Sequence, residues 1–262
     1  MRLPISLHGL CSDVTLTAAI AEHHFTLTHL DVIGSTNDEA MAHLRKSGAG
    51  DHWVVADEQS GGKGRLGRQW ISPKGNLYAS LALRDPCPMA SGYQLGFVAA
   101  LAIYDVLIAL GVGPHHLSLK WPNDVLLDGA KLSGILVEGG TLPNGNFGAV
   151  IGCGINVGFH PEDTPYPATD LAASGVIASV SEVFAALAAA FRASLDQFDH
   201  GAGFGLLRER WITLARGIGG PVTVRQSDGV LEGIFRGLDA QGKLLLERDG
   251  TVTPVIAGDV FY

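Results

Sequence analysis

The chain has few cysteines, and the three that it contains lie far apart. Cys11, Cys87 and Cys153 form no Cys-x-x-Cys pair, the usual spacing of zinc ligands and redox dithiols. An odd number of scattered thiols also does not fit the disulfide framework of a small secreted domain. The sequence therefore predicts a protein that folds without structural zinc or disulfides, with buried or idle thiols in a reducing compartment.

Long hydrophobic runs and an excess of positive charge are lacking as well. The first fifteen residues contain no convincing apolar core of a signal peptide. The most apolar stretch, residues 95–110, is short and carries Asp105, which favours a buried helix over a membrane span. The formal net charge of −8 argues against a general attraction to nucleic acid. We therefore expect a cytoplasmic protein that binds neither membranes nor nucleic acid.

Two common catalytic signatures are missing. No His-Glu-x-x-His spacing occurs among the ten histidines, and adjacent pairs such as His115-His116 rarely face one metal ion. No Gly-x-Ser-x-Gly elbow occurs either, so a serine hydrolase is not supported.

Strand and helix patterns alternate over most of the 262 residues and then change near residue 219. β-Branched and aromatic runs predict strands at 52–58, 76–83, 117–121, 124–127, 134–138 and 149–157. Helices are expected after Ser35 and at 94–110, 181–198 and 204–215. Short strands with Asp-Gly and Gln-Gly turns follow. We expect an α+β (α/β) domain over residues 1–215 and a small β-barrel or sandwich over 216–262.

The segment from Gly62 to Trp70 combines glycines with positive charge. Its glycines fit Gly-x-Gly-x-x-Gly, but Pro73 and Gly75 argue against the long helix that a dinucleotide fold needs next. Glycine N–H groups and basic side chains together form an anion cradle, and a tryptophan offers a surface on which a base can stack. Residues 62–75 contain no acid, and their basic residues are Lys63, Arg65, Arg68 and Lys74.

The run QSGGKGRLGRQW, residues 59–70, resembles the signature loop of biotin–protein ligases. Further segments match that family in the same order: STN at 35–37, KWPND at 120–124, KLSGILVE at 131–138, GCGINV at 152–157, and PAT at 167–169 followed by Leu171. The tail, with GIFRG at 233–237 and LLLE at 244–247, resembles the family's C-terminal SH3-like domain. The resemblance covers about residues 30 to 262.

Some positions depart from the family pattern. Lys63 replaces the usual arginine, which keeps the charge but loses the bidentate fork. Cys153 replaces an apolar residue, and Asp170 replaces a serine. Members that also repress transcription carry an N-terminal helix-turn-helix domain, and only about 30 residues precede the STN segment here. We therefore expect a monofunctional ligase that does not bind DNA.

The resemblance implies a mixed-sheet ligase domain that uses ATP, Mg²⁺ and biotin. In the family's reaction, the carboxylate of biotin attacks the α-phosphate of ATP, which gives biotinyl-AMP and pyrophosphate. A lysine of a biotin carboxyl carrier domain then attacks the acyl carbon, and AMP leaves. The expected partners are this carrier domain of a carboxylase and a second copy of the chain in a homodimer.

The resemblance also assigns catalytic residues. Arg65 and Lys131 are expected to offset the repulsion between carboxylate and phosphate, because preorganised cations need no reorganisation during the reaction. Asp124 is expected to hold Lys120 or Lys131 in place or to help bind Mg²⁺. No metal ligand is assigned, since Mg²⁺ usually keeps water and phosphate oxygens in its coordination shell.

The resemblance assigns the remaining site residues to biotin or to the nucleotide. The polar ring of biotin needs partners in a largely apolar pocket. Its expected contacts are Ser35, Thr36, Asn37, Gln59, Lys63, Gly64, Arg65 and Lys131. The expected contacts of ATP and the adenylate are Arg65, Arg68, Asn123, Asn156 and Trp70, which stacks on adenine. Two structural alternatives stay open: Ser35 and Asn37 can cap a helix, and residues 122–124 can form a turn.

Two other functions also stay open. A lipoate- or octanoate-handling ligase or transferase is related in fold, but it has a different signature, and the octanoyl-transferring type needs a nucleophilic cysteine. A non-catalytic biotin sensor would bind biotin and a partner without releasing pyrophosphate. The basic loop and the KWPND segment favour biotin ligation over both.

Overall fold

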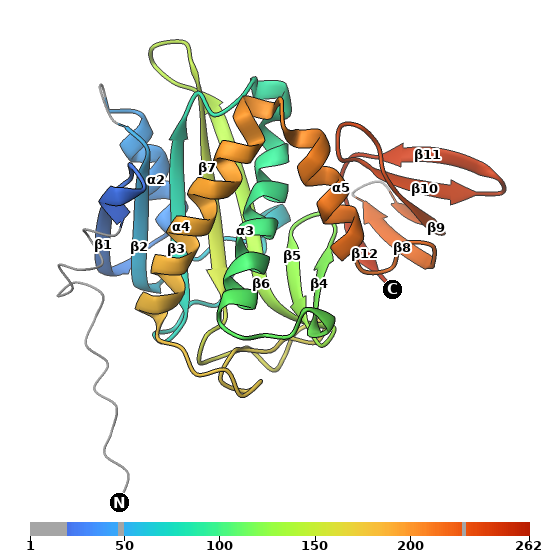
Figure 1. The fold of residues 1–262 in the computed structure, drawn as a ribbon, viewed down its shortest axis with the longest axis horizontal. Coiled ribbons are helices and arrows are strands. Elements are labelled where there is room, and N and C mark those ends of the chain that lie inside the picture. Colours follow the sequence, from blue (N-terminus) through green and yellow to red (C-terminus); the bar gives the residue numbers. More distant parts are fainter. Residues whose placement is uncertain (1–19, 47–49, 227–228) are drawn as a thin grey trace, which may run out of the picture.

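A computed structural model describes residues 20–46, 50–226 and 229–262 of the chain. The expectations about a signal peptide and about Cys11 fall on residues outside these ranges. The described chain forms a large α/β part followed by a smaller sheet at the C-terminus (Figure 1).

A mixed sheet of seven strands forms the centre of the large part, in the order β1-β2-β3-β7-β6-β5-β4. The first two strands pair in parallel and all other neighbours are antiparallel. The strands are β1 (Thr26–Ile33), β2 (His52–Gln59), β3 (Leu77–Arg84), β4 (Leu117–Lys120), β5 (Asp124–Leu127), β6 (Ala130–Thr141) and β7 (Phe147–Ile155). The sequence predicted six of them and missed β1, an edge strand without a fully buried residue.

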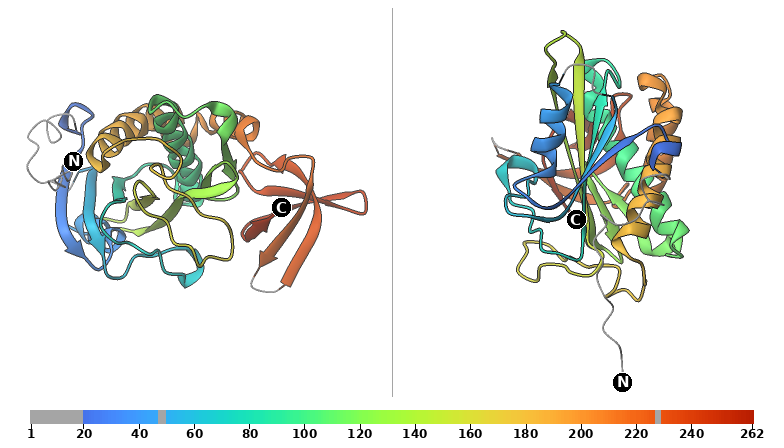
Figure 2. Two further views of the ribbon diagram at one scale, coloured as in Figure 1. Left: turned by 90° about the horizontal axis from the view of Figure 1, so that it is seen from below. Right: turned by 90° about the vertical axis from the view of Figure 1, so that its left-hand side faces the viewer.

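Helices cover both faces of this sheet. The helices α3 (Leu95–Ala109) and α4 (Val180–Phe198) pack on one face, and α2 (Thr36–Leu44) lies on the other (Figure 2). Helix α5 (Phe204–Leu214) follows α4. Short 3₁₀ turns are η2 (Arg65–Gly67), η3 (Met89–Gln94), η4 (Pro114–His116) and η5 (Asp199–Gly201). The expected helices are therefore confirmed, with ends shifted by one or two residues.

Helix α3 was expected to be a buried helix, and this expectation is confirmed. Residues 89–109 are long and apolar enough to cross a membrane, but 78% of the most apolar window is buried within the protein. The core continues to α4, where Phe184 and Phe191 meet the edge of Trp53 at ring-centroid distances of 5.5 and 5.3 Å. Such edge-to-face pairs stabilise a core beyond the burial of their area. At the start of α4, Ser179 and Glu182 form a reciprocal capping box.

The C-terminal part is a five-stranded antiparallel sheet in the order β11-β10-β9-β8-β12. Its strands are β8 (Pro221–Gln226), β9 (Gly229–Leu238), β10 (Leu244–Arg248), β11 (Thr251–Val255) and β12 (Asp259–Phe261). Asp249 and Gly250 both have positive φ, as the expected Asp-Gly turn requires. The expected separate small β domain is confirmed, but its described strands do not close into a barrel, because β11 and β12 end the sheet without pairing with each other.

The C-terminal sheet is attached to the large part through buried contacts. The indole Nε1 of Trp121 donates a hydrogen bond to the Gly242 carbonyl at 3.1 Å. Gly242 has a φ of 90° and lies against Phe97 and Phe204, so a Cβ there would come within 3.0 Å of both rings. Helix α5 ends at Leu214 and β8 begins at Pro221. The domain boundary between residues 215 and 216 remains a prediction within this connection.

Candidate active site

A pocket of about 340 Å³ lies between the sheet, α2 and the signature loop. Its size suits a small organic ligand. The sequence assigned residues from five separate segments to one site, and the structure brings all of them to the wall of this pocket. These residues are Ser35, Thr36, Asn37, Gln59, Lys63, Gly64, Arg65, Arg68, Trp70, Asn123, Asp124, Lys131 and Asn156.

Three glycines on β6 and β7 form the bottom of the pocket, which we call the glycine floor: Gly134, Gly152 and Gly154. A Cβ on Gly154 would lie 2.5 Å from the Trp70 indole, and one on Gly134 would lie 2.8 Å from it. A Cβ on Gly152 would lie 2.2 Å from Asn37 Oδ1. Side chains from α2 and from the signature loop can therefore lie directly on the backbone of the sheet.

The signature loop, residues 59–70, folds back on itself. A β-bridge pairs Gln59 with Ser72 just beyond the loop, and the Trp70 amide donates to the Gly62 carbonyl at 2.9 Å. A Cβ on Gly62 would lie 2.4 Å from the Trp70 carbonyl oxygen, so this close crossing requires glycine. At the tip, Leu66 is 73% exposed and adopts a left-handed conformation with a φ of 57°. The fold of the loop sets Arg65 and Trp70 in the pocket.

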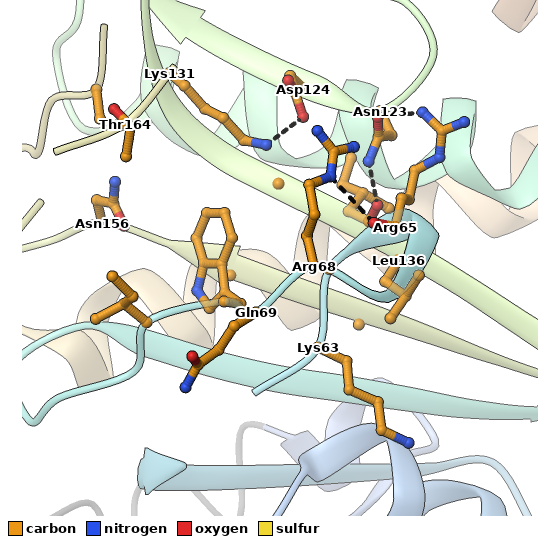
Figure 3. Close-up of a pocket in the computed structure, with 18 of the residues that line it drawn as sticks. Lys63, Arg65, Arg68, Gln69, Asn123, Asp124, Lys131, Leu136, Asn156 and Thr164 are labelled. Atoms are coloured by element: carbon orange, nitrogen blue, oxygen red, sulfur yellow. Dashed lines mark hydrogen bonds and ion pairs between the residues drawn. The ribbon is translucent and has the colours of Figure 1, made fainter. Parts of the chain in front are cut away.

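A close ion pair joins two of the assigned catalytic residues. Lys131 Nζ lies 2.7 Å from Asp124 Oδ1, and both side chains are nearly buried (Figure 3). The ammonium also lies 5.3 Å from the centroid of Trp70 and 5.4 Å from that of Tyr166. Of the two lysines considered for Asp124, Lys131 is therefore the one that forms the ion pair.

Arg65 links the signature loop to two other parts of the chain. Its Nη1 donates to Asn123 Oδ1 at 3.1 Å and to the Gly258 carbonyl at 3.4 Å. Asn123 is itself fixed, because its Nδ2 donates to the Ile135 carbonyl at 2.6 Å. Burial lowers the pKa of the Arg65 guanidinium, and the nearby carboxylates of Asp259 and Asp124 oppose this effect. A half-buried cation held on neutral oxygens is well suited to accept an anionic ligand.

Two other basic side chains of the loop already have acidic partners. Arg68 Nη2 donates to Asp259 Oδ1 at 2.8 Å, which joins the loop to β12. Lys63 Nζ lies 2.5 Å from Asp38 Oδ1 on α2, and in Figure 3 it points away from Lys131. Lys63 therefore lines the pocket without directing its charge to the centre, and its expected contact with biotin remains a prediction.

Buried polar residues line the end of the pocket beside α2. Gln59 Oε1 accepts hydrogen bonds from Thr36 N at 2.8 Å and Thr36 Oγ1 at 3.0 Å. Asn37 Nδ2 donates to Glu138 Oε2 at 2.7 Å, and Ser80 Oγ donates to Asn37 Oδ1 at 2.6 Å. Ser35 occupies the N-cap position of α2, but its side chain makes no capping hydrogen bond. Helix capping by the Ser35 hydroxyl is therefore not what the structure shows.

Asn156 is held by the backbone around it. Its Nδ2 donates to the Thr169 carbonyl at 2.9 Å, and its Oδ1 accepts from Asn76 Nδ2 at 3.4 Å. The same wall continues with a loop whose Ala168 forms a bridge with Lys131, which brings Tyr166 into the pocket. Asn156 thus lies in the pocket as expected, and its contact with the nucleotide stays a prediction.

Several pocket residues were missed or received no role from the sequence. Tyr166 lies in an irregular loop, while Asp259 and Phe261 belong to the other sheet, so no periodicity connected them with the site. Lys120 was considered only as a lysine of KWPND that Asp124 could hold in place. Its ammonium lies 5.0 Å from the Tyr166 centroid and 5.5 Å from the Phe261 centroid, and burial lowers its pKa. The sequence contained a signal only for Lys120.

The described part of the chain contains no accessible nucleophilic thiol. Cys153 and Cys87 are buried, and burial raises the pKa of both thiols, that of Cys87 to about 11. Cys153 belongs to the core on the α3 side of the sheet, while its neighbours Gly152 and Gly154 face the pocket. A protonated, buried thiol is a poor nucleophile.

Comparisons with known proteins agree with this geometry. Residues 30–156 match the model of the biotin/lipoate A/B protein ligase family, and residues 217–262 match that of the biotin protein ligase C-terminal domain. A biotin–[acetyl-CoA-carboxylase] ligase of Paracoccus denitrificans is 37% identical, over 87% of this chain and 97% of that protein. One from Mycobacterium tuberculosis is 35% identical, over 89% and 88%.

Solved structures agree as well. The biotin protein ligase of Aquifex aeolicus in complex with biotin and ATP superposes with a TM-score of 0.76 at 27% identity, covering 90% of this chain and 97% of that one. Among the sequence relatives, a bifunctional ligase/repressor of Escherichia coli is 34% identical, and the match covers 88% of this chain and 72% of that protein. On the combined evidence of its pocket, both family models and these relatives, the chain belongs to the biotin protein ligase family.

Proposed function

We propose that the chain is an ATP-dependent ligase that activates biotin as biotinyl-AMP and transfers it to a lysine of a biotin carboxyl carrier domain. The observation that carries this proposal is the placement of Arg65 and Lys131 in one pocket with the polar residues around Thr36. One end of the pocket offers hydrogen-bond partners for a cyclic urea, and the other offers fixed positive charge for anions. The relatives described above carry ligase names that agree with this division.

In the first step, an oxygen of the biotin carboxylate forms a bond to the α-phosphorus of ATP, and the bond to the pyrophosphate leaving group breaks. Two anions must approach each other for this to happen. Lys131 and Arg65 lower the repulsion, and Asp124 holds the Lys131 ammonium in place at 2.7 Å. Arg68 is available to the phosphates once they compete with Asp259 for its guanidinium.

In the second step, the amine of the carrier lysine forms an amide with the acyl carbon, and AMP leaves with the electron pair of the broken bond. Trp70 and Tyr166 enclose the centre of the pocket and limit the access of water to the mixed anhydride. Trp70 provides the flat surface on which we expect adenine to stack. Asn123 and Asn156 complete the expected nucleotide site.

The residues present fit a Mg²⁺ ion that arrives on the phosphates of ATP. Among the described residues, no group of three or more His, Cys, Asp or Glu side chains is arranged to hold a metal ion. Asp124 is the carboxylate placed to take part, beside Lys131. When bound, Mg²⁺ would neutralise charge on the phosphates.

The site favours biotin over lipoate or an octanoyl group. Thr36, Gln59 and Asn37 place polar atoms at the end of the pocket beside α2, whereas the end of a lipoyl or octanoyl chain offers no N–H donor to pair with them. The buried state of Cys87 and Cys153 further argues against a cysteine-dependent transferase. The presence of Arg65 and Lys131 in the pocket argues against a sensor without chemistry.

Incubation with MgATP, a biotin carrier domain and either biotin or lipoate tests the proposal. Intact-mass analysis should show one added biotinyl group on the carrier and no lipoyl group. Carrier modified only in the lipoate reaction, or biotin bound without any pyrophosphate release, would reject biotin ligation. We further propose a cytoplasmic enzyme, and a homodimer that sedimentation can test.

A further inference from the structure

Glu138 lies beside this pocket, outside its lining, and has no part in the reaction described above. It follows the glycine floor on β6, and its Oε2 accepts a hydrogen bond from Asn37 Nδ2 at 2.7 Å. This contact links the long strand β6 to the first turn of α2. Asn37 is 4% exposed and lies on the bare backbone of Gly152, so its carboxamide has little room to move.

The contact fixes which way the Asn37 carboxamide faces. An ionised carboxylate only accepts hydrogen bonds, so the nitrogen of Asn37 must face Glu138 and the oxygen must face away from it. That oxygen meets Ser80 Oγ at 2.6 Å, and Ser80 is fully buried. Glu138 therefore orients Asn37 so that Ser80 faces the amide oxygen, which can only accept a hydrogen bond.

The side-chain oxygens of Thr36, Asn37, Gln59 and Ser80, which we call the hydroxyl cluster, share fewer protons than they have contacts with one another. Ser80 Oγ lies 2.7 Å from Thr36 Oγ1 and 2.6 Å from Asn37 Oδ1, and Thr36 Oγ1 lies 3.0 Å from Gln59 Oε1. Only the Ser80 and Thr36 hydroxyls carry protons for these three contacts, because the two amide oxygens only accept. The cluster is one proton short.

Gln59 cannot supply the missing proton by turning over. Its oxygen also accepts from the Thr36 amide at 2.8 Å, and its Nε2 donates to Ser72 Oγ at 3.0 Å. Asn37 could supply it, because a turn of its carboxamide would place Nδ2 against Ser80. The carboxylate of Glu138 opposes that turn, since it would bring the Asn37 oxygen against an acceptor.

We propose that Glu138 is a positioning residue that keeps the hydroxyl cluster one proton short, so that the pocket accepts N–H hydrogen bonds from the ring of its substrate. The Thr36 hydroxyl, whose proton is used inside the cluster, offers the pocket a lone pair. A cyclic urea carries such N–H donors, and this inference therefore rests on biotin being the substrate. Glu138 selects the polarity of the site through Asn37 and does not touch the substrate itself.

Replacement of Glu138 by glutamine tests this role, because it keeps the shape and lets the Asn37 carboxamide turn. Calorimetric titration of the full chain with biotin should show affinity lowered about ten- to a hundredfold, the range of one or two hydrogen bonds to buried groups. The KM for ATP at saturating biotin should stay within about twofold of the wild type, which distinguishes this effect from general damage. Glu162→Gln, at an exposed glutamate outside the pocket, is the matched control.

A double-mutant cycle with Ser80→Ala tests whether the effect passes through the cluster. Ser80→Ala alone should also weaken biotin binding, and Glu138→Gln should cost much less in that background, because the link to Thr36 is already broken. Any of three results would overturn the proposal. Glu138→Gln could leave the biotin affinity unchanged, or it could raise the KM for ATP as much as it weakens biotin binding. It could also weaken biotin binding equally with and without Ser80→Ala. If Glu138→Gln does not fold, reduced affinity in Ser80→Ala supports the cluster and unchanged affinity rejects it. A wild-type chain that does not bind biotin would instead reject the proposed function.

Discussion

At the scale of single residues, the account depends on charges that are held in place by neighbours. Lys131 pairs with Asp124, and Arg65 rests on Asn123 and the Gly258 carbonyl. Such supports fix a cation before the substrates arrive, which is what electrostatic catalysis requires. Sequence motifs predicted which residues meet, but they could not show that Lys63 is paired with Asp38, because side-chain partners depend on the packing of α2.

The ion pair leads to a prediction for Asp124→Asn. Lys131 should lose its electrostatic anchor, and the rate of biotinyl-AMP formation should fall about ten- to a thousandfold, as for removal of one group that organises a transition state. Single-turnover quench of adenylate formation measures this rate. The KM for biotin should change much less, and a rate equal to that of the wild type would show that Asp124 does not position Lys131.

His52 leads to a prediction of how stability depends on pH. Burial and the neighbouring His43, whose ring stacks at 3.9 Å, lower the pKa of His52 to about 4. The folded-state pKa lies below the usual value of 6.5, so the folded protein favours the neutral His52 ring. The stability that this neutral ring contributes is complete above pH 6.5 and is lost as the pH falls towards 4. The loss should reach up to about 3 kcal/mol of unfolding free energy. Urea titrations between pH 4 and 7 measure it, and His52→Gln should flatten that part of the curve.

At the scale of elements, the pocket depends on strands β6 and β7, which together carry glycine at three positions of its floor. The glycine floor lets Trp70 and Asn37 lie against the sheet. Sequence patterns predicted β6 and β7 because β-branched and aliphatic residues surround these glycines. The patterns missed β1, because its residues are half-buried or exposed at the sheet edge. They also could not show that the C-terminal sheet stays open, because pairing between distant strands leaves no local signal.

Gly154→Ala tests the glycine floor. The added Cβ would lie 2.5 Å from the Trp70 indole, so the ring must leave its place. We expect adenylate formation to fall about tenfold or more, because small displacements of positioning groups have large effects on rate. Gly140→Ala on β6 is the control, since no atom lies within 4 Å of a Cβ there. Tryptophan fluorescence and single-turnover rates should both change in Gly154→Ala only. Equal behaviour of the two variants would contradict the role of the floor.

At the scale of the whole molecule, the active site lies between two sheets. Asp259 and Phe261 of β12 reach the pocket that α2, β6 and the signature loop build. The family motifs predicted a C-terminal domain, but nothing local in residues 259–261 indicated that they line the site. The contact depends on how the two sheets meet, and the Trp121–Gly242 hydrogen bond and the Arg68–Asp259 ion pair both help to fix this.

Trp121→Phe tests this attachment. It removes the hydrogen bond to the Gly242 carbonyl and leaves a buried acceptor unpaired, which should cost about 1 to 3 kcal/mol of unfolding free energy. The KM for ATP should rise, because β12 forms part of the pocket wall. Trp211→Phe is the control, because the Trp211 Nε1 is buried without a hydrogen-bond partner and its removal breaks no such bond. Urea unfolding and ATP titrations of both variants decide whether the attachment affects the site; identical results for both would contradict it.

The central claim is that fixed cations in this pocket join the carboxylate of biotin to ATP, and biotin-dependent pyrophosphate release from MgATP measures it most directly. The wild-type chain should release pyrophosphate only when biotin is present. Lys131→Met should still bind biotin, but its rate of pyrophosphate release should fall by about a hundredfold or more, because the cation between the two anions is gone. Release at the wild-type rate by Lys131→Met, or no biotin-dependent release by the wild-type chain, would contradict the account.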